Sequence, residues 1–363
     1  MDKIGVLLKE AAGEGIFPGA ILLVAYDGDV VFFEEVGFLS IIPERVPIQK
    51  DTIFDLASLT KPLATTLALM KLVDQGKISL NQPLSELIKT IPLKDKKSLT
   101  PRLLLNHSAG LADWKPFYLN LIRYTPEQRK RILRHWILEE PLAYASGKRC
   151  LYSDLGFMIL EWLIEAVTGM PMAAFLETSF YQPLSLEKTF LSSGSSFKSF
   201  EKGMFAATED CLWRKRIIQG EVHDENAFAM GGYSGHAGLF GTAEEVYSIV
   251  NLLREHYQGR RGDYLHPRTV REFYRRQDIV DGCTWALGWD TPSSRDSSSG
   301  QYFSRNSVGH LGFTGTSIWM DLEKDIMVIF LTNRVHPTRN NEKIKAFRPL
   351  LHDTIMKELN LRS

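Results

Sequence analysis

Apolar, β-rich runs lie near both ends of this chain, and apolar residues at helical spacing lie between them and at the two termini. Two apolar, β-rich runs, 19–26 and 30–33, flank the turn sequence Asp27-Gly28-Asp29, which predicts a β-hairpin near the N-terminus. Runs of the same kind return near the C-terminus at 308–313, 317–322 and 326–331, with residues 323–325 as the turn of a second hairpin. Both ends of the chain are therefore predicted to form strands.

Elsewhere, apolar residues recur at helical spacing. The runs predicted as helices are 3–13, 62–75, 154–168, 243–257 and 341–359. Glycines indicate a long loop between 190 and 242, and the Ser-rich stretch 291–307 is predicted to be a surface segment. We expect an α+β fold in which one antiparallel sheet is built from both chain termini, is flanked by helices and carries an inserted, mainly helical region.

The length of 363 residues suggests either two domains or one large domain with an insertion. We interpret residues 1–363 as one domain made of two subdomains. An α/β subdomain is expected over about 1–60 and 243–363, and a mostly helical subdomain over about 61–242.

The chain has 43 Lys+Arg and 43 Asp+Glu residues, so its formal net charge is zero. A neutral body does not attract nucleic acid or an anionic membrane, and we expect neither as a partner. The three cysteines, Cys150, Cys211 and Cys283, are an odd and sparse set, so no disulfide framework is expected. Because the sequence has no C-x-x-C pair and no H-E-x-x-H motif, we expect no metal site and no cofactor.

Charged side chains interrupt the first ten residues too early for the apolar core of a signal peptide. No uncharged apolar run in the sequence is long enough to cross a bilayer. The sequence as written therefore predicts a soluble, cytoplasmic protein. A periplasmic or extracellular location would apply if a leader had been removed.

Ser58 and Lys61 are the first candidates for chemistry. They lie three residues apart, at the start of the predicted helix 62–75, so their side chains share one face of its first turn. A serine hydroxyl needs a base, and Lys61 can be that base only if burial and the helix dipole lower its pKa. Otherwise Ser58 would be a plain N-cap, although a capping box prefers Glu or Gln where Lys61 stands.

The Ser-x-x-Lys pattern occurs four times in this sequence, so the pattern alone identifies no site. The other three pairs are Ser185–Lys188, Ser195–Lys198 and Ser199–Lys202. Only Ser58 combines an apolar lead-in with a long helix behind it, and we therefore favour the Ser58–Lys61 pair.

Tyr152 and Asp154 stand at the start of the predicted helix 154–168. A tyrosine held near a lysine can carry a proton in catalysis. Taken alone, however, Tyr152 is better explained as a half-buried aromatic residue and Asp154 as an N-cap.

The glycine-containing segment 309–316 includes His310, Gly312 and Phe313. Glycines in a strand let the backbone approach a ligand closely, and a backbone N–H here could form an oxyanion hole with that of Ser58. His236, followed by Gly238 in the glycine-rich loop, is a competing His-x-Gly that we rank second.

Rival chemistries have weaker support. A G-x-S-x-G elbow is approached only by residues 232–236, where His236 fills the last glycine position. The glycine loop lacks both G-x-G-x-x-G and the P-loop lysine, which argues against nucleotide binding. His223 and Asp224 are two potential metal ligands without a third.

In order along the chain, Ser58-x-x-Lys61, Tyr152-x-Asp154 and His310-x-Gly312 resemble the motifs of the serine β-lactamase and penicillin-binding protein clan. The resemblance is nearest to class C β-lactamases and their esterase and D,D-peptidase relatives. Further stretches that resemble this family are 103–111, 235–244 and 220–227, the last of them typical of a subgroup often tied to cell-wall peptide chemistry. The resemblance implies a β-lactamase/transpeptidase-like fold and a serine hydrolase that works through an acyl-enzyme.

The resemblance also implies roles for individual residues. Ser58 would be the acylated nucleophile, and Lys61 and Tyr152 would share the general-base and acid work. The backbone amides of Ser58 and Phe313 would form the oxyanion hole, and His310 would line the site. The residues expected near the substrate are Asp154, Gly312, Phe313, His236 and His223.

Two departures from the clan motifs affect the expected substrate. His310 stands where the clan has lysine, which weakens the positive charge that holds a substrate carboxylate at neutral pH. Asp154 stands where the clan has asparagine, so it cannot donate a hydrogen bond to a substrate and would stabilise protonated Lys61 if close. We expect a hydrolase of an ester or amide, such as a cell-wall-derived peptide, a muropeptide or a small ester. The alternatives are a true β-lactamase and a catalytically inactive penicillin-binding-type receptor.

Overall fold

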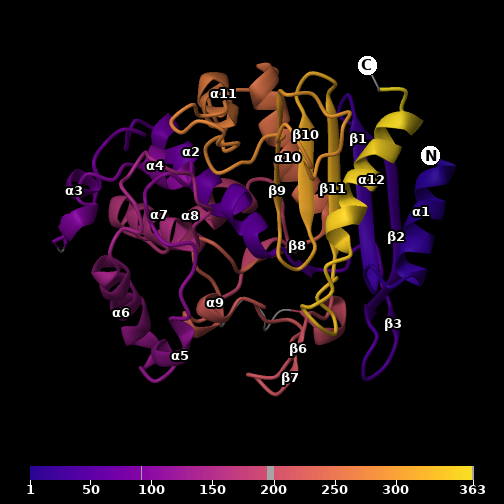
Figure 1. Cartoon of the computed structure of the whole chain (residues 1–363), viewed down its shortest axis with the longest axis horizontal. Helices are drawn as coiled ribbons and strands as arrows, with labels where there is room; N and C mark the ends of the chain where they lie inside the picture. Colours follow the sequence, from indigo (N-terminus) through magenta and orange to yellow (C-terminus); the bar gives the residue numbers. More distant parts are fainter. Residues whose placement is uncertain (91, 194–199, 362–363) are drawn as a thin grey trace.

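The computed structural model describes residues 1–90, 92–193 and 200–361. Its main feature is a six-stranded antiparallel sheet in the order β3-β2-β1-β11-β10-β9 (Figure 1). The strands are β1 (Gly19–Tyr26), β2 (Asp29–Ser40), β3 (Val46–Pro47), β9 (Ser307–Leu311), β10 (Ser317–Asp321) and β11 (Ile326–Thr332). Because β1 pairs with both β2 and β11, the two ends of the chain meet inside this sheet. The predicted α+β architecture and both predicted hairpins are confirmed.

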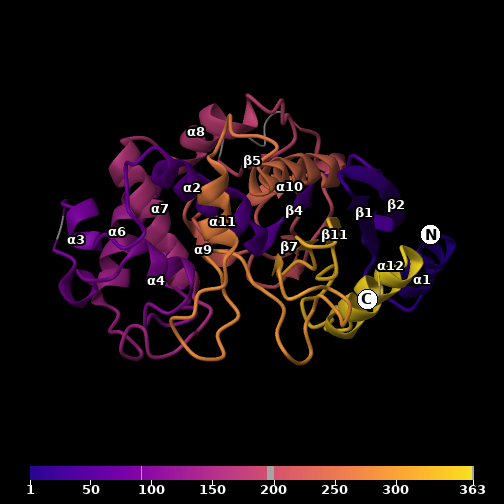
Figure 2. The same ribbon diagram turned by 90° about the horizontal axis from the view of Figure 1, so that it is seen from above.

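Both faces of this sheet are buried, since successive side chains of a strand point to opposite faces. Alternate residues of β1 pack in one cluster with α1 (Asp2–Gly13) and α12 (Ile344–Glu358), and the others pack on the face that α10 (Ala243–Gln258) covers. The first set is Ala20, Leu22 and Val24, and the second is Ile21, Leu23 and Ala25. Figure 2 shows α10 on one side of β1 and the pair of α1 and α12 on the other. All three helices occur where the sequence predicts them.

The helical region lies beside the β9 edge of the sheet (Figure 1). Its α-helices are α2 (Leu67–Asp74), α3 (Leu84–Leu87), α4 (Pro101–Leu105), α5 (Tyr118–Leu121), α6 (Pro126–Glu139), α7 (Asp154–Thr168), α8 (Met172–Leu176), α9 (Glu225–Ala229) and α11 (Pro267–Tyr274). The 3₁₀ and π segments are η1 (Ala57–Leu59), η2 (Lys61–Thr66), η3 (Lys94–Lys96), η4 (Glu177–Tyr181) and η6 (Lys202–Met204). The short strands are β4 (Phe54–Asp55), β5 (Phe190–Leu191), β6 (Asp210–Cys211), β7 (Arg216–Ile217) and β8 (Leu239–Gly241). The division into two subdomains stays a prediction.

Helix α7 has the predicted bounds and forms the core of the helical region. Ser153 caps its first turn by accepting a hydrogen bond from the Gly156 N–H, and Gly169 ends it in the left-handed conformation with φ 71°. Among the described residues, no single helix is long and apolar enough to cross a membrane. Only α7 taken together with Met172–Tyr181 reaches that length and composition, across a bend of 69°.

The segment 291–307, predicted to lie on the surface, is only partly exposed. It has no regular structure up to β9, but Ser299 and Phe303 are buried. The Phe303 ring lies 5.5 Å from that of His352 on α12, so the segment packs against this helix. The segment thus lies at the surface as predicted, but a Ser-rich composition does not reveal the aromatic residues, Tyr302 and Phe303, that pack it against the rest of the protein.

Candidate active site

Ser58 lies on a sharp turn between β4 and η2. The preceding residue, Ala57, has φ 48°, a backbone conformation that residues other than glycine rarely adopt. Such strain persists only where the surrounding structure holds it, and it is often found at functional sites. The predicted helix 62–75 therefore begins as the short segment η1 and the π-type turn η2, and becomes a regular α-helix only at Leu67.

Lys61 connects Ser58 to two other segments. Its side chain is fully buried, and its Nζ lies 3.0 Å from Ser58 Oγ, 3.3 Å from the His236 backbone oxygen and 2.7 Å from Asp154 Oδ1. The loop that contains His236 and the start of α7 thus converge on the lysine beside the serine. The structure brings together Ser58, Lys61, Asp154 and His236, which are far apart in the sequence.

The charge of Lys61 differs from the sequence-based expectation. Burial acts to lower the pKa of Lys61, but the Asp154 carboxylate, with a further contribution from Tyr152, outweighs burial and raises this pKa above its usual value. The expected lowering is therefore wrong for this structure, because the sequence does not reveal that Asp154 touches Lys61. Lys61 is held as an ammonium ion, as the replacement of asparagine by Asp154 implied.

Tyr152 lies over the Lys61 ammonium, with Nζ 4.6 Å from the centre of its ring. The rings of His107, Trp285 and His310 surround it, with centroids 4.7, 5.4 and 6.0 Å away. Burial raises the pKa of the Tyr152 hydroxyl, whereas Lys61 and Ser58 act in the opposite direction. Any phenolate at this position would depend on the Lys61 charge for its stability.

His310 is buried on β9, at the edge of the main sheet, with 2% of its surface exposed. Its Nδ1 lies 2.8 Å from the Leu311 backbone oxygen, so Nδ1 carries the proton and Nε2 is left as an acceptor without a protein partner among the described residues. Burial and then the neighbouring Lys61 lower the pKa of His310 to about 3. This side chain is therefore neutral around pH 7 and supplies no fixed positive charge.

In the part of the chain that the structure describes, the backbone N–H groups of Ser58 and Phe313 have no protein acceptor. Gly312 lets the two segments approach closely, since a Cβ at this position would lie 2.8 Å from the Leu56 backbone oxygen. The Phe313 side chain is 49% exposed. Two unpaired N–H groups beside a serine are the elements of an oxyanion hole.

The side chains of His236 and His223 are both buried. His236 Nε2 lies 3.0 Å from Asp224 Oδ1, and although burial opposes it, this carboxylate raises the pKa of His236. His223 Nε2 lies 3.1 Å from Glu209 Oε2, and its ring stacks on that of Phe313 with centroids 5.5 Å apart. Their contact with a substrate stays a prediction.

Asp154, Asp224 and His236 could hold a metal ion by spacing alone, because their ligand atoms all lie within 4.8 Å of one another. Lys61 already pairs with Asp154, and Asp224 already accepts from His236. The positive Lys61 ammonium disfavours a second cation beside the same carboxylate. The charges of this group are therefore balanced by protein side chains.

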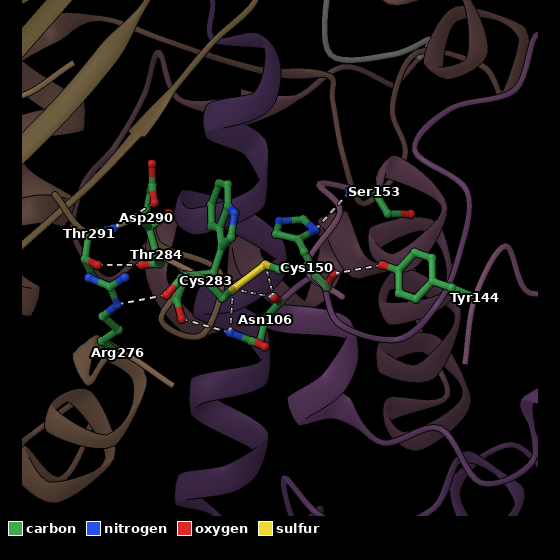
Figure 3. Close-up of a disulfide and its surroundings, with 11 residues drawn as sticks. Asn106, Tyr144, Cys150, Ser153, Arg276, Cys283, Thr284, Asp290 and Thr291 are labelled. Carbon is green, nitrogen blue, oxygen red and sulfur yellow. Dashed lines mark hydrogen bonds between the residues drawn. A yellow bond between two sulfur atoms is a disulfide. The ribbon is translucent and has the colours of Figure 1, made fainter. Parts of the chain in front are cut away.

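Cys150 and Cys283 form a disulfide, although the odd and sparse set of cysteines predicted no disulfide framework (Figure 3). Their Cα atoms are 5.8 Å apart, across a sequence separation of 133 residues, and Cys211 is the free, buried cysteine. An odd count hid the pair, because one unpaired cysteine does not prevent the other two from meeting. The bridge joins the segment just before Tyr152 to the segment just before Trp285.

Three residues of the site were missed by sequence reasoning: Asp55, His107 and Trp285. Trp285 belongs to an irregular segment with no pattern around it, whereas His107 lies within 103–111, which already resembled a family segment. Asp55 lies three residues before Ser58, but nothing in the spacing connects it to the distant segments that it contacts.

The other Ser-x-x-Lys pairs have no comparable surroundings. Lys188 forms an ion pair with Asp51 Oδ2 at 2.8 Å. The Ser195–Lys198 pair and Ser199 lie outside the described residues. Within the described residues, Ser58 is the serine of this pattern that contacts its lysine.

Comparisons with known proteins identify the family of this chain. Residues 7–351 match the sequence profile of the family described as Beta-lactamase. The chain is 31% identical to an N-acetylmuramyl-L-alanine amidase of Bacillus subtilis (strain 168), over 93% of this chain and 81% of that protein. It is 32% identical to a putative D-alanyl-D-alanine carboxypeptidase of Salmonella typhimurium (strain LT2), over 90% of this chain and 81% of that protein.

Solved structures share the fold. One is EstCE1, a hydrolase with promiscuous acyltransferase activity, with a TM-score of 0.72 and 22% identity over 96% of this chain and 98% of that one. Another is the octameric penicillin-binding protein homologue from Pyrococcus abyssi, with a TM-score of 0.72 and 21% identity over 96% of this chain and 77% of that one. These likenesses confirm the predicted β-lactamase/transpeptidase-like fold.

Proposed function

Because the chain belongs to the Beta-lactamase family and is a serine hydrolase that works through an acyl-enzyme, we propose that Ser58 is its nucleophile and that it cleaves an amide or ester of a cell-wall-derived peptide or muropeptide. The observation that carries the assignment of Ser58 is its contact with the fully buried Lys61, at 3.0 Å, beside two unpaired backbone N–H groups. The substrate class is supported by the names of the amidase and carboxypeptidase relatives.

In the proposed acylation step, Tyr152 reacts as a phenolate whose hydroxyl proton has gone to solvent. Ser58 Oγ attacks the carbonyl carbon of the substrate while its own proton passes to the phenolate oxygen. The Lys61 ammonium stabilises the charge that Tyr152 must carry, and Asp154 keeps Lys61 protonated. The negative oxygen of the tetrahedral intermediate accepts hydrogen bonds from the N–H groups of Ser58 and Phe313.

The leaving amine or alcohol then takes the proton from Tyr152, and the bond between the carbonyl carbon and the leaving group breaks. Deacylation repeats these steps with water in place of Ser58 Oγ. This assignment divides the roles that sequence reasoning left shared, because a lysine held in its charged form is a poor base.

A substrate screen tests this function. Purified protein is incubated with muropeptides, D-Ala-D-Ala peptides and activated acetate esters, and the products are identified by mass. We expect hydrolysis of at least one amide or ester class and a loss of about 10³-fold or more in kcat for Ser58→Ala. The matched control is Ser185→Ala, which removes the serine of another Ser-x-x-Lys pair and is expected to leave the rate unchanged. Equal rates for Ser58→Ala and the parent would exclude Ser58 as nucleophile.

A further inference from the structure

Asp55 is a buried residue that forms hydrogen bonds with the chain neighbours of both predicted oxyanion-hole donors, Ser58 and Phe313. It lies on β4, three residues before Ser58, and 2% of its surface is exposed. Within the described ranges it forms no ion pair with a cationic side chain. A buried carboxylate that lacks a charged partner is costly unless hydrogen bonds satisfy it, so the groups that donate to it indicate its role.

The first contact holds the Ser58 half of the site. Asp55 Oδ1 accepts a hydrogen bond of 2.8 Å from the Ala57 N–H. Ala57 is the residue with φ 48°, and its carbonyl carbon is bonded to the Ser58 nitrogen. This hydrogen bond therefore fixes the strained turn that aims the Ser58 N–H.

The second contact holds the Phe313 half. The Asp55 backbone oxygen accepts a hydrogen bond of 2.8 Å from Thr314 Oγ1, and Thr314 directly follows Phe313. One residue further on, the Leu56 backbone oxygen accepts a hydrogen bond of 3.1 Å from Thr316 Oγ1. The turn after β9 is thus attached to the strand that leads into Ser58.

The third contact connects Asp55 to Phe313 through His223. Asp55 Oδ2 accepts a hydrogen bond of 2.6 Å from the His223 N–H, and the His223 ring stacks on the Phe313 ring. Burial raises the pKa of Asp55 above its usual value, and the N–H groups of His223 and Ala57 oppose this rise by donating to the charged form. Both carboxylate oxygens are therefore engaged, each on a different half of the site.

We infer that Asp55 is a positioning residue of the reaction, which sets the distance and angle between the Ser58 and Phe313 N–H groups so that both point at one oxyanion. This inference rests on the proposed function. Donors must be held within about 0.5 Å of their productive place to stabilise the transition state, and Asp55 is a rigid, buried connection between the segments that carry them. Its effect is expected on the rate of attack at Ser58 and not on the folded fraction.

The test measures the rate constant and the final stoichiometry of Ser58 labelling by an activated fluorophosphonate, together with kcat and KM on an activated acetate ester. Asp55→Asn preserves the shape but places an amide NH₂ against one of the two N–H donors. We expect complete labelling, a labelling rate and kcat about 10- to 100-fold lower, and a small change in KM. A merely structural role would lower the labelled fraction and leave the rate constant of the labelled molecules unchanged.

A second pair of variants decides the question even if Asp55→Asn does not fold. Thr314→Val keeps the size of the side chain but removes the hydroxyl that donates to the Asp55 backbone oxygen, and Thr314→Ser keeps that hydroxyl. We expect Thr314→Val to be slowed at full stoichiometry and Thr314→Ser to recover most of the rate. Asp51→Asn, on an exposed aspartate, is the control for the loss of a carboxylate.

Parent-like rate constants in Thr314→Val, or in folded Asp55→Asn, would overturn the inference. This result is distinguishable from failure of the proposed function, in which Ser58→Ala would itself retain activity. If Ser58→Ala is inactive while the Asp55 and Thr314 variants react at the parent rate, only the positioning role is excluded.

Discussion

Lys61 is the residue whose charge determines how the proposed mechanism works. A fully buried amine would ordinarily lose its proton more easily, but the Asp154 carboxylate 2.7 Å away reverses this tendency. Charged Lys61 can stabilise a negative oxygen on Tyr152 or Ser58, but it cannot accept a proton. Because this contact prevents Lys61 from acting as a base, Tyr152 is the better candidate for the general base.

The first prediction concerns this contact. In Asp154→Asn, burial of Lys61 is no longer opposed by the carboxylate, so the pKa of Lys61 falls. Activity that needs the ammonium ion is then lost at lower pH, and the alkaline limb of the pH profile of kcat/KM moves to lower pH. The matched control is Asp95→Asn. This variant removes the carboxylate partner of Lys96, another buried lysine. An alkaline limb at the same pH in Asp154→Asn and the parent would contradict the role of Asp154.

The second prediction concerns His310. Because its pKa is lowered to about 3, His310 is uncharged at neutral pH and offers no cation to the carboxylate of a β-lactam. We expect weak or absent turnover of a chromogenic cephalosporin beside clear hydrolysis of an activated acetate ester, measured with the same preparation. Efficient cephalosporin hydrolysis would show that the site holds a substrate carboxylate by other means and would favour a β-lactamase function.

At the scale of elements, the site depends on how separate segments are tied together. The disulfide (Figure 3) joins the segment before Tyr152 to the segment before Trp285. The rings of Tyr152 and Trp285 lie 5.4 Å apart. Asn106 lies against the same bridge and donates from Nδ2 to the Trp285 backbone oxygen at 2.8 Å. Disulfides persist mainly in oxidising compartments, so this pair bears on the cytoplasmic location, which stays a prediction.

The third prediction tests this bridge. A cross-link over 133 residues constrains the unfolded chain, so the double variant Cys150→Ser, Cys283→Ser is expected to lose about 2–4 kcal/mol in free energy of unfolding under oxidising conditions. The measurement is denaturant unfolding with and without a thiol reductant. Reductant should destabilise the parent and leave the double variant unchanged. Equal responses of the two proteins would show that the cysteines are not paired in solution.

The fourth prediction concerns Glu209, next to β6, which links His223 to Arg339. Burial acts to raise the pKa of Glu209, but hydrogen bonds from His223 and Arg339 outweigh it and lower the pKa from 4.5 to about 2. Its contribution to stability is thus fully present above about pH 4.5 and is lost as the pH falls through about 2.

We therefore expect Glu209→Gln to be less stable than the parent at pH 7 and to lose less stability between pH 4.5 and pH 2. Thermal unfolding across this range measures the difference. Glu201→Gln, on an exposed glutamate, is the control. Parallel pH curves for Glu209→Gln and the parent would contradict the assignment.

The sequence predicted regular elements well and the contacts between irregular ones poorly. Strands β1 and β11 are nearly continuous apolar runs and helix α7 has apolar residues at helical spacing, so their places follow from the side chains that must be buried. The turn at Ala57 and the segment around Trp285 have no such period. Their conformations are set by distant partners, such as Asp55 and the Cys150–Cys283 bridge, which no local pattern encodes.

At the scale of the whole molecule, the candidate site is assembled from three distant parts of the chain. Ser58 and Lys61 follow the first hairpin, Tyr152 precedes α7 in the helical region, and His310 lies on the edge strand β9. Motif order and a resemblance brought these residues together before the fold was known, but their electrostatics could not be predicted, since pKa values depend on which carboxylate touches which base. The zero net charge provides no long-range steering, so selection of the substrate must come from short-range contacts in the site.

The most direct test of the central claim is the mass of the protein during reaction with an activated acetate ester, followed by peptide mapping of the acylated residue. We predict a mass increase of one acyl group, located on the peptide that contains Ser58, and its absence in Ser58→Ala. An acyl group on another residue, or hydrolysis by Ser58→Ala at the parent rate, would contradict the assignment of Ser58 as the nucleophile.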